Sequence, residues 1–572
     1  MQFAIKVKGA VNDYSGIFLS KDYLFYVLFQ RGSAMKKAVI SFLIGLTFFF
    51  VSCGENKKTN DESGTPDEEV SDSEVDEDGL ENDEDVIDEI FSPFIDALKK
   101  DLEKSDALGV SVAVMKGGNV VFAHAFGFKD AGRKVPLTPE TLMQIGSTTK
   151  QMTATALLQK VEEEKVALEN TINDVLPDLE FKLDETWDDS ITVHHLLSHQ
   201  GGFYDWIPWD FMPEDDMLEG IGSTYAKKYF LMNPPGAFYN YSNPNFAFAG
   251  LITETLDNRF WPDIMKEDVF APLGMERTFL RRSEVKKDGD YSDSYGYDYN
   301  EIESAEFTDI TIDKIADSAF TRPAGLVWTT PLQMMKWADF IMNGNSDVLG
   351  DKYRKMITTP HVDTLYGAGT MHYGYGMMVE TGYMDKAGKW YEIPVWEHGG
   401  NTISFSNILY ILPDQDFAVS ICSSGYGTDF TESLDVAITT LADLPEPSET
   451  VPKYETDPEK FDDHVGTYND AYNVGTMIIT RDGDKLLVSA PTLEGYNYEV
   501  GPELIPVSSD IFFLYLDGQP LDITFVKEEG HSKYMRNRIF VLTKVEEEET
   551  LITPTSQQIE NFILRSKRKL LP

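Results

Sequence analysis

The chain has 572 residues, of which 42% are hydrophobic and 12% aromatic. These values are typical of a globular protein, and the length favours two or three domains over a single core. The formal net charge of −47 argues against nucleic-acid binding, because a phosphate backbone requires a basic face. With only two cysteines in the chain, a disulfide framework is not the main source of stability.

A basic and then apolar segment lies near the N-terminus. Lys36 and Lys37 precede the apolar stretch 38–52, which is short for a membrane span and has the composition of a secretory signal peptide. A secretory signal peptide is an N-terminal segment, so residues 1–34 ahead of it are not expected. We therefore expect them to be a mis-assigned upstream extension, with the true start at Met35, or else an unusual N-terminal region.

The apolar stretch ends in Phe-Val-Ser-Cys-Gly, which resembles a bacterial lipobox except that Phe50 replaces the usual leucine. In that motif the cysteine, here Cys53, is lipidated and becomes the new N-terminus. We predict that residues 35–53 are a lipoprotein signal peptide and that the protein is lipid-anchored outside the cytoplasm, in the bacterial cell envelope. An ordinary secretory signal and a single membrane anchor are the alternatives.

An acidic segment follows. Residues 54–90 contain 17 acidic side chains against Lys57 and Lys58. Such a stretch buries too little apolar surface to fold, and its charges repel one another. We interpret residues 54–88 as a disordered linker between the membrane and the folded domains.

The next segment, residues 89–448, has the pattern of one mixed α/β domain. Apolar residues recur at helical spacing or in short runs separated by turns. The predicted elements are a hairpin (110–116 and 120–126), a helix (147–164), a second hairpin (404–412 and 417–422) and a closing helix (432–444). Strands at both ends with helices between them predict an antiparallel sheet flanked by helices.

Beyond this domain the pattern changes to short strands at regular spacing. Residues 449–550 are predicted to form a small all-β domain, a barrel or a sandwich, with strands at 476–480, 485–489, 511–516 and 538–542. Residues 551–572, which include a basic cluster, are interpreted as a tail.

The first candidate for chemistry is Ser147-Thr-Thr-Lys150 at the start of the predicted helix. Residues i and i+3 are neighbours on one face of a helix. A serine there lies at the positive end of the helix dipole, with a backbone N–H available to an oxyanion. A lysine of lowered pKa one turn later could accept the serine proton. Alone the pattern is weak, because Ser-x-x-Lys also occurs three more times in this chain.

The motifs that follow in the chain strengthen the interpretation of Ser147 and Lys150 as catalytic residues. Together they resemble, in order, the motifs of the class C β-lactamase family of penicillin-recognising serine hydrolases, over roughly residues 100–445. The matching segments are Leu-Leu-Ser-His-Gln-Gly (196–201), Tyr-Ser-Asn (241–243), Pro-Leu-Gly-Met (272–275), Arg-Pro-Ala-Gly (322–325), Tyr-Gly-Tyr-Gly (373–376) and Glu-His-Gly-Gly (397–400).

The resemblance implies a β-lactamase/transpeptidase-like fold and a set of roles. Ser147 would be the nucleophile and Lys150 its activating partner, with Tyr241 as a second proton carrier. Asn243 would orient the lysine and bind the substrate amide. Either Lys150 or Tyr241 could be the general base. The oxyanion would be bound by the backbone N–H groups of Ser147 and Asn401.

One departure from the family bears on the substrate. Where β-lactamases carry Lys-Thr-Gly, this chain has His398-Gly399-Gly400. The lysine and threonine help to hold a substrate carboxylate, whereas a histidine is only partly charged at neutral pH and glycine has no hydroxyl. We therefore expect an esterase or D-amino-acid peptidase or carboxypeptidase, with a β-lactamase as the alternative, and we expect His398 to become cationic at lower pH.

The sequence supports other classes of function less well than it supports a serine hydrolase. A metal site at His194, His195 and His199 lacks the glutamate of a His-Glu-x-x-His arrangement, so we expect neither a metal nor another cofactor. A non-catalytic sensor or binding protein that kept the fold is the alternative outside enzymes. The expected partners are a small ester, amide or peptide and a membrane through the lipid anchor, with no nucleic acid; the sequence does not indicate an oligomeric state.

Overall fold

The computed structural model describes residues 89–179, 190–205, 226, 229–297, 307–546 and 551–567. The predicted upstream extension, signal peptide and acidic linker lie outside these residues. Within the described part of the chain, no helix is long and apolar enough to cross a membrane.

An eight-stranded antiparallel sheet forms the centre of the first domain, in the order β2-β1-β14-β13-β12-β9-β8-β7. Strands from the two ends of this domain are neighbours in the sheet, because Val110 of β1 lies opposite Ser423 of β14. The strands are β1 (Gly109–Lys116), β2 (Asn119–Gly127), β7 (Val362–Asp363), β8 (Met371–Tyr373), β9 (Met378–Glu380), β12 (Val395–Asn401), β13 (Ser406–Leu412) and β14 (Phe417–Ser423).

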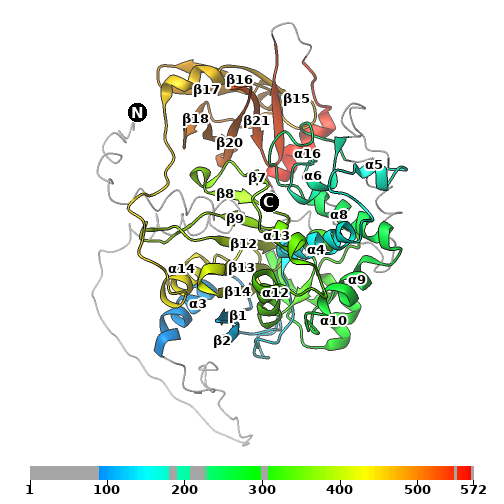
Figure 1. The fold of residues 1–572 in the computed structure, drawn as a ribbon. Coiled ribbons are helices and arrows are strands. Elements are labelled where there is room, and N and C mark those ends of the chain that lie inside the picture. Colours follow the sequence, from blue (N-terminus) through cyan, green and yellow to red (C-terminus); the bar gives the residue numbers. More distant parts are fainter. Residues whose placement is uncertain are drawn as a thin grey trace, which may run out of the picture.

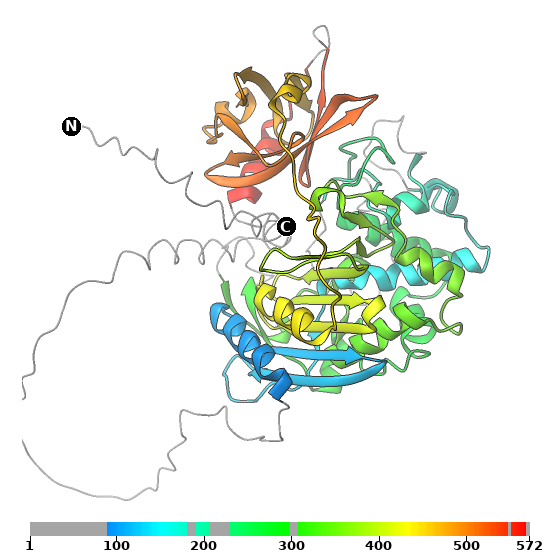
Figure 2. The same cartoon turned by 60° about the vertical axis from the view of Figure 1, so that its left-hand side comes forward.

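Helices cover both faces of this sheet, and alternate residues of β1 belong to the two resulting cores. Val112 and Val114 pack with α3 (Ser92–Lys104) and α14 (Thr431–Leu441), which lie together on one face (Figures 1 and 2). Ala113 and Met115 belong to the larger core on the other face. The helices of that layer include α4 (Thr149–Glu162), α8 (Asn243–Asp257), α11 (Arg322–Gly325), α12 (Pro331–Asn343) and α13 (Asp351–Ile357).

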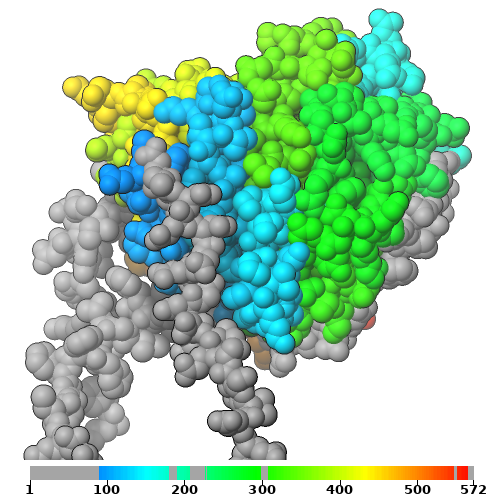
Figure 3. All heavy atoms as spheres, turned by 90° about the horizontal axis from the view of Figure 1, so that it is seen from below, coloured from blue at the N-terminus to red at the C-terminus, as the bar shows by residue number. Residues whose placement is uncertain are grey.

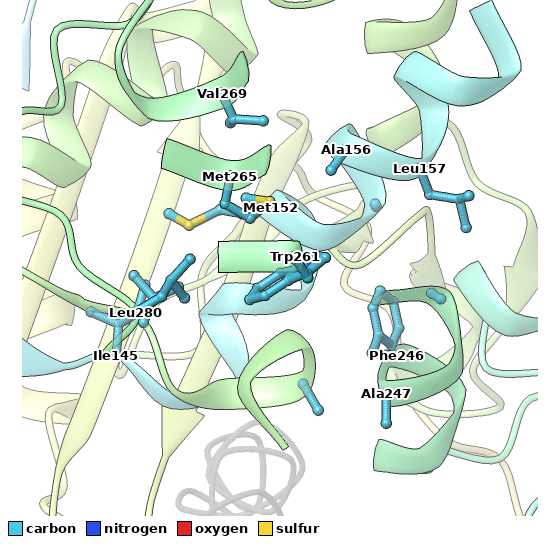
Figure 4. Close-up of a cluster of buried hydrophobic side chains, with 14 of the residues drawn as sticks. Ile145, Met152, Ala156, Leu157, Phe246, Ala247, Trp261, Met265, Val269 and Leu280 are labelled. Atoms are coloured by element: carbon cyan, nitrogen blue, oxygen red, sulfur yellow. The ribbon is translucent and has the colours of Figure 1, made fainter. Parts of the chain in front are cut away.

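The larger core fixes α4 against α8. Met152 of α4, Phe246 of α8 and Trp261 of α9 (Trp261–Ile264) are fully buried in it. Figure 4 shows these side chains together with Met265 between the helices. Because interiors pack densely, this contact holds the starts of α4 and α8 in a fixed relation. Short helices complete the layer: α5 (Ile172–Val175), α6 (Val193–Leu197) and α10 (Arg282–Asp288). The described part of the domain also has three two-stranded pairs: β3 (Met143–Gln144) with β6 (Trp328–Thr329), β4 (Ser294–Tyr297) with β5 (Phe307–Ile310), and β10 (Tyr383–Met384) with β11 (Trp390–Tyr391). The last pair contributes Tyr383 and Tyr391 to the core that contains α3 and α14.

The second domain is a closed antiparallel barrel around its own core. Its strands are β15 (Gly466–Asp470), β16 (Gly475–Asp482), β17 (Lys485–Ser489), β18 (Glu503–Pro506), β19 (Ile511–Leu516), β20 (Gln519–Glu528), β21 (His531–Asn537) and β22 (Phe540–Lys544). The barrel stands on the first domain, on the side of β7, β8 and α6 (Figures 1 and 2). In the view from below, the coloured surface belongs mainly to the first domain, where the blue N-terminal segments lie beside the green middle segments (Figure 3).

Apolar and polar contacts join the two domains. Tyr534 and Val541 of the barrel form a cluster with Tyr204 and Phe238 of the first domain. Beside this cluster, the buried guanidinium of Arg536 donates a hydrogen bond of 2.9 Å to the carbonyl of residue 239. The barrel therefore packs directly against the chain that leads into α8.

The structure confirms both predicted hairpins, the helix after Ser147 and the β-barrel alternative for the C-terminal domain. Two local predictions were wrong. Residues 551–572 are not only a tail, since Ser556–Lys567 form α16 and bury Ile559 and Phe562 in the barrel core. The predicted strand 538–542 begins later, at Phe540, so Arg538 lies in the turn between β21 and β22.

Candidate active site

The site begins at the N-terminus of α4. Ser147 lies in a 3-10 turn, Gly146–Thr148, that leads directly into this helix. Gly146 has a φ of +56°, and a Cβ there would overlap the backbone nitrogen of Asn401 at the end of β12. A Cβ on Gly400 would likewise overlap the carbonyl oxygen of Ile145. Glycine at both positions allows the strand to approach the serine, which places the backbone of Asn401 beside Ser147.

Lys150 is the central side chain of the site and is fully buried. Its Nζ lies 2.9 Å from Ser147 Oγ, 2.7 Å from Asn243 Oδ1 and 2.7 Å from the carbonyl oxygen of Ala324. Burial lowers the pKa of Lys150 well below the ordinary lysine value, and the nearby charge of Arg538 lowers it further, while Asp205 opposes the shift. A neutral amine has two N–H donors and one lone pair. The amide and carbonyl oxygens accept those two hydrogens, which leaves the lone pair directed at the serine hydroxyl.

Asp205 determines how the amide of Asn243 is oriented. Its Oδ1 accepts hydrogen bonds from the backbone N–H of Asn243 at 2.8 Å and from Nδ2 of the same residue at 3.1 Å. Since the amide nitrogen faces this carboxylate, the amide oxygen faces Lys150. The sequence analysis did not identify Asp205, which stands outside the motifs that resemble the family.

The ring of Tyr241 also lies close to the amine of Lys150. The Nζ of Lys150 is 4.9 Å from its ring centroid, and the ring packs 4.1 Å from that of the buried His199. Burial raises the pKa of Tyr241, while the charge of Arg538 and a hydrogen bond with Ser147 oppose the rise. The phenol is therefore protonated at neutral pH. The same burial lowers the pKa of His199, which accepts a hydrogen bond from the backbone N–H of Ser242 through Nδ1.

His398 is next to this group on β12, but it does not have the charge that the sequence suggested. Burial lowers its pKa to about 3. Nδ1 donates to the carbonyl oxygen of Gly399 at 2.6 Å, and Nε2 accepts from the hydroxyl of Tyr373 at 3.2 Å. The ring is neutral across the physiological range, so the expectation of a partly charged, pH-responsive His398 was wrong.

A residue of the barrel also reaches the site. The guanidinium of Arg538 lies 4.3 Å from the ring centroid of Tyr241. It also forms an ion pair with Asp205, in which Nε donates a hydrogen bond to Oδ2 at 2.8 Å and Nη2 lies 2.6 Å from the same oxygen. A sequence-based search could not associate residue 538 with Ser147, because they are in different domains and the motif search ended at residue 445.

The structure thus brings together Ser147, Lys150, Tyr241, Asn243 and His398, with Gly399, Gly400 and Asn401 on the adjoining strand. Cys53, the predicted lipidation site, lies outside the described residues. No group of three or more His, Cys, Asp or Glu residues in the described part of the chain is placed to hold a metal ion.

Comparison with known proteins identifies the family. Residues 94–442, more than half of the chain, match the family model described as Beta-lactamase. The chain belongs to the Beta-lactamase family. Protein flp of Staphylococcus aureus is 22% identical to this member over 67% of this chain and 70% of its own length. Unguisins hydrolase ungD' of Aspergillus campestris is 27% identical over 59% of this chain and 62% of its own length.

Solved structures support the fold. A crystal structure of SurE aligns with a TM-score of 0.59 and 19% identity, covering 80% of this chain and 98% of that protein. The octameric penicillin-binding protein homologue of Pyrococcus abyssi aligns with a TM-score of 0.52 and 20% identity, covering 79% of this chain and 99% of that protein. This family member therefore has the β-lactamase/transpeptidase-like fold, followed by a separate all-β barrel domain.

Replacing Gly400 tests the close approach of β12 to the serine. Gly400→Ala should destabilise the protein by about 1–3 kcal/mol, as overpacking does, and slow the labelling of Ser147 by a fluorophosphonate. Gly495→Ala is the matched control, because a Cβ there meets no atom within 4 Å. Thermal unfolding and labelling rates measure both effects. Equal behaviour of the two variants would contradict the geometry described for the site.

Proposed function

We propose that this family member is a serine hydrolase that cleaves an ester or amide bond through an acyl-enzyme on Ser147. The observation that carries the proposal is the buried amine of Lys150, whose Nζ lies 2.9 Å from Ser147 Oγ. Nucleophilic catalysis by serine requires a base within hydrogen-bond reach of the hydroxyl. A lysine of lowered pKa that is held by two other acceptors satisfies this requirement.

In the proposed reaction Ser147 Oγ attacks the substrate carbonyl carbon while its proton passes to Lys150 Nζ. The negative charge that develops on the carbonyl oxygen is bound by the backbone N–H groups of Ser147 and Asn401. Collapse of the tetrahedral intermediate breaks the bond to the leaving group, which takes a proton. Water then attacks the acyl-enzyme by the same route, which releases the acid and restores the serine.

The opposite pKa shifts of Lys150 and Tyr241 support an assignment of the two proton carriers. A lowered pKa leaves the lysine neutral and able to accept a proton, whereas a raised pKa keeps the phenol protonated and able to donate one. We therefore assign the general base to Lys150 and the proton transfer to the leaving group to Tyr241.

Amide or peptide substrates are supported by the names of similar proteins. One is called an unguisins hydrolase, and a D-amino acid amidase from Ochrobactrum anthropi aligns with a TM-score of 0.51. The neutral His398 in place of the β-lactamase lysine favours substrates without a carboxylate beside the scissile bond. We propose an esterase or D-amino-acid peptidase activity for this chain, ahead of β-lactamase activity.

We also propose that the protein is exported and lipid-anchored through Cys53. The support is the sequence of residues 35–53, a basic start and an apolar stretch that ends at a lipobox-like cysteine. Mass spectrometry of membrane fractions should find a diacylated N-terminal peptide that begins at Cys53. A soluble mature protein that begins elsewhere would refute the anchor, and a peptide from residues 1–34 would refute the start at Met35.

Labelling and kinetics test the acyl-enzyme. Ser147→Ala should abolish both hydrolysis of 4-nitrophenyl acetate and labelling by a fluorophosphonate, because the attacking oxygen is lost. Lys150→Ala and Tyr241→Phe should each lower kcat by at least about 100-fold. The double variant should lose less activity than the two single losses combined, because the two groups act as a unit. Labelling that persists in a folded Ser147→Ala variant would reject Ser147, and an unreactive wild type would favour the non-catalytic binding protein.

The neutrality of His398 leads to a prediction about substrate preference. A missing charge-assisted hydrogen bond costs about 1.5–3 kcal/mol, so kcat/KM for a short aryl ester should exceed that for a chromogenic cephalosporin by at least about tenfold. Because the pKa of His398 is about 3, this ratio should not change between about pH 5 and 8. A ratio that falls towards low pH with a midpoint near the ordinary histidine pKa would show that His398 titrates and that its burial has been misjudged.

A further inference from the structure

We propose that Arg538 of the barrel domain is a positioning residue of the active site, acting through Asp205 on Asn243 and through ring contact on Tyr241. This inference rests on the proposed hydrolase function and extends it, because it makes the second domain part of the machinery that prepares Ser147. Neither the family match, which ends at residue 442, nor the motifs of the first domain include this arginine.

A continuous chain of polar contacts leads from the barrel to the reacting atoms. Arg538 Nε donates a hydrogen bond to Oδ2 of Asp205, Nη2 lies in ion-pair contact with the same oxygen, and the other oxygen of this carboxylate accepts two hydrogen bonds from Asn243. The amide oxygen of Asn243 in turn accepts from Lys150 at 2.7 Å. Each contact restricts the next, so a change at Arg538 reaches the amine that faces Ser147.

The burial of the ion pair makes this link necessary. The side chain of Asp205 is only 2% exposed and that of Arg538 is 23% exposed. An ionised carboxylate at such a position is costly unless a charge is paired with it. Without the arginine, Asp205 would lose the ion-pair partner that holds its carboxylate in place. The group that orients the Asn243 amide would then be free to move.

Neighbouring contacts fix the turn that carries Arg538. Arg536 on β21 donates hydrogen bonds to the carbonyl oxygens of residues 239 and 364 of the first domain, at 2.9 and 3.2 Å. Tyr366 of the first domain donates to Asp522 of β20. These contacts join the barrel to residue 239, two positions before Tyr241, and to the segment 364–366. The turn is therefore held in place rather than resting on an open surface.

The electrostatic surroundings of Lys150 allow the role to be tested. Tyr241, His199 and His398 face the amine, and their pKa shifts leave all three neutral. The two charged groups that act on the lysine are Arg538, which lowers its pKa, and Asp205, which raises it. Removing one or the other should therefore shift the protonation of Lys150 in opposite directions.

The experiment compares Arg538→Gln, Asp205→Asn and the double variant of the full-length protein. Arg481→Gln is the matched control, since this barrel arginine pairs with an aspartate, Asp462, at 2.9 Å. The readouts are kcat and KM for 4-nitrophenyl acetate and the pH dependence of fluorophosphonate labelling. Thermal unfolding checks that each variant is folded.

Arg538→Gln should lower kcat by about 10- to 100-fold with little change in KM, because the reacting groups are misplaced while a small uncharged ester binds as before. Loss of the positive charge raises the pKa of Lys150, so the acidic limb of the labelling profile should move to higher pH. Asp205→Asn should also lower kcat, but it should move that limb to lower pH. The double variant should cost less than the sum of the two.

Several results would overturn the proposal. If Arg538→Gln has the kcat and pH profile of Arg481→Gln while wild type remains active, Arg538 has no positioning role. If Arg538→Gln and Asp205→Asn shift the acidic limb of the labelling profile in the same direction, Arg538 does not act on the amine of Lys150 as proposed. If only KM for carboxylate-bearing substrates changes, Arg538 binds substrate and is not a positioning residue. If Arg538→Gln does not fold, Arg538→Lys takes its place; it keeps the charge but loses the contact of two nitrogens with Oδ2 of Asp205, so kcat should fall without a shift of the limb. A wild-type protein that does not react at Ser147 would overturn the proposed function and this inference together.

Discussion

The buried amine of Lys150 is the constraint on which the rest of the site depends. A lysine inside a protein must either pair with an anion or lose its proton, and here its three contacts are all to uncharged oxygens, on Ser147, Asn243 and Ala324. These oxygens belong to segments at the starts of α4 and α8 and in α11, so the three segments must meet at one point. The apolar core between α4 and α8 makes them meet, and the glycines at 146 and 400 allow the sheet to approach the same point. Packing far from the serine thereby determines how the serine is activated.

Much of this arrangement could be predicted from the sequence, because it depends on local patterns. The two short apolar runs of the first hairpin indicated the sheet, and the alternation of side chains along a strand puts Val112 and Ala113 in the cores on its two faces. The spacing of Ser147 and Lys150 on one helix turn predicted their contact, which the structure confirms at 2.9 Å. The Tyr-Ser-Asn motif indicated Tyr241 and Asn243 because the order of the motifs in the chain was that of the family. The catalytic roles themselves stay predictions.

The parts that could not be predicted depend on contacts between distant segments and on burial. His398 was expected to be partly charged, and only its burial explains why its pKa falls to about 3, against the opposing effect of the hydrogen bond to the Gly399 carbonyl. The ion pair of Asp205 with Arg538 spans more than three hundred residues and two domains, so no spacing rule could suggest it. The helix α16 was missed because its amphipathic pattern is short and follows a strongly acidic stretch, although Phe562 is buried in the barrel core. In each case the tertiary surroundings decide the state of a side chain that looks ordinary in the sequence.

The most direct test of this account is the titration of Lys150 itself. In protein labelled with carbon-13 at the lysine Cε, the Lys150 signal can be assigned by its absence from Lys150→Arg and followed as the pH changes. The account predicts that this signal titrates well below the range of the exposed lysines, because burial and Arg538 both disfavour the ammonium form. A Lys150 that titrates together with the surface lysines would carry a proton when Ser147 must lose one, and this result would contradict the assignment of Lys150 as the base.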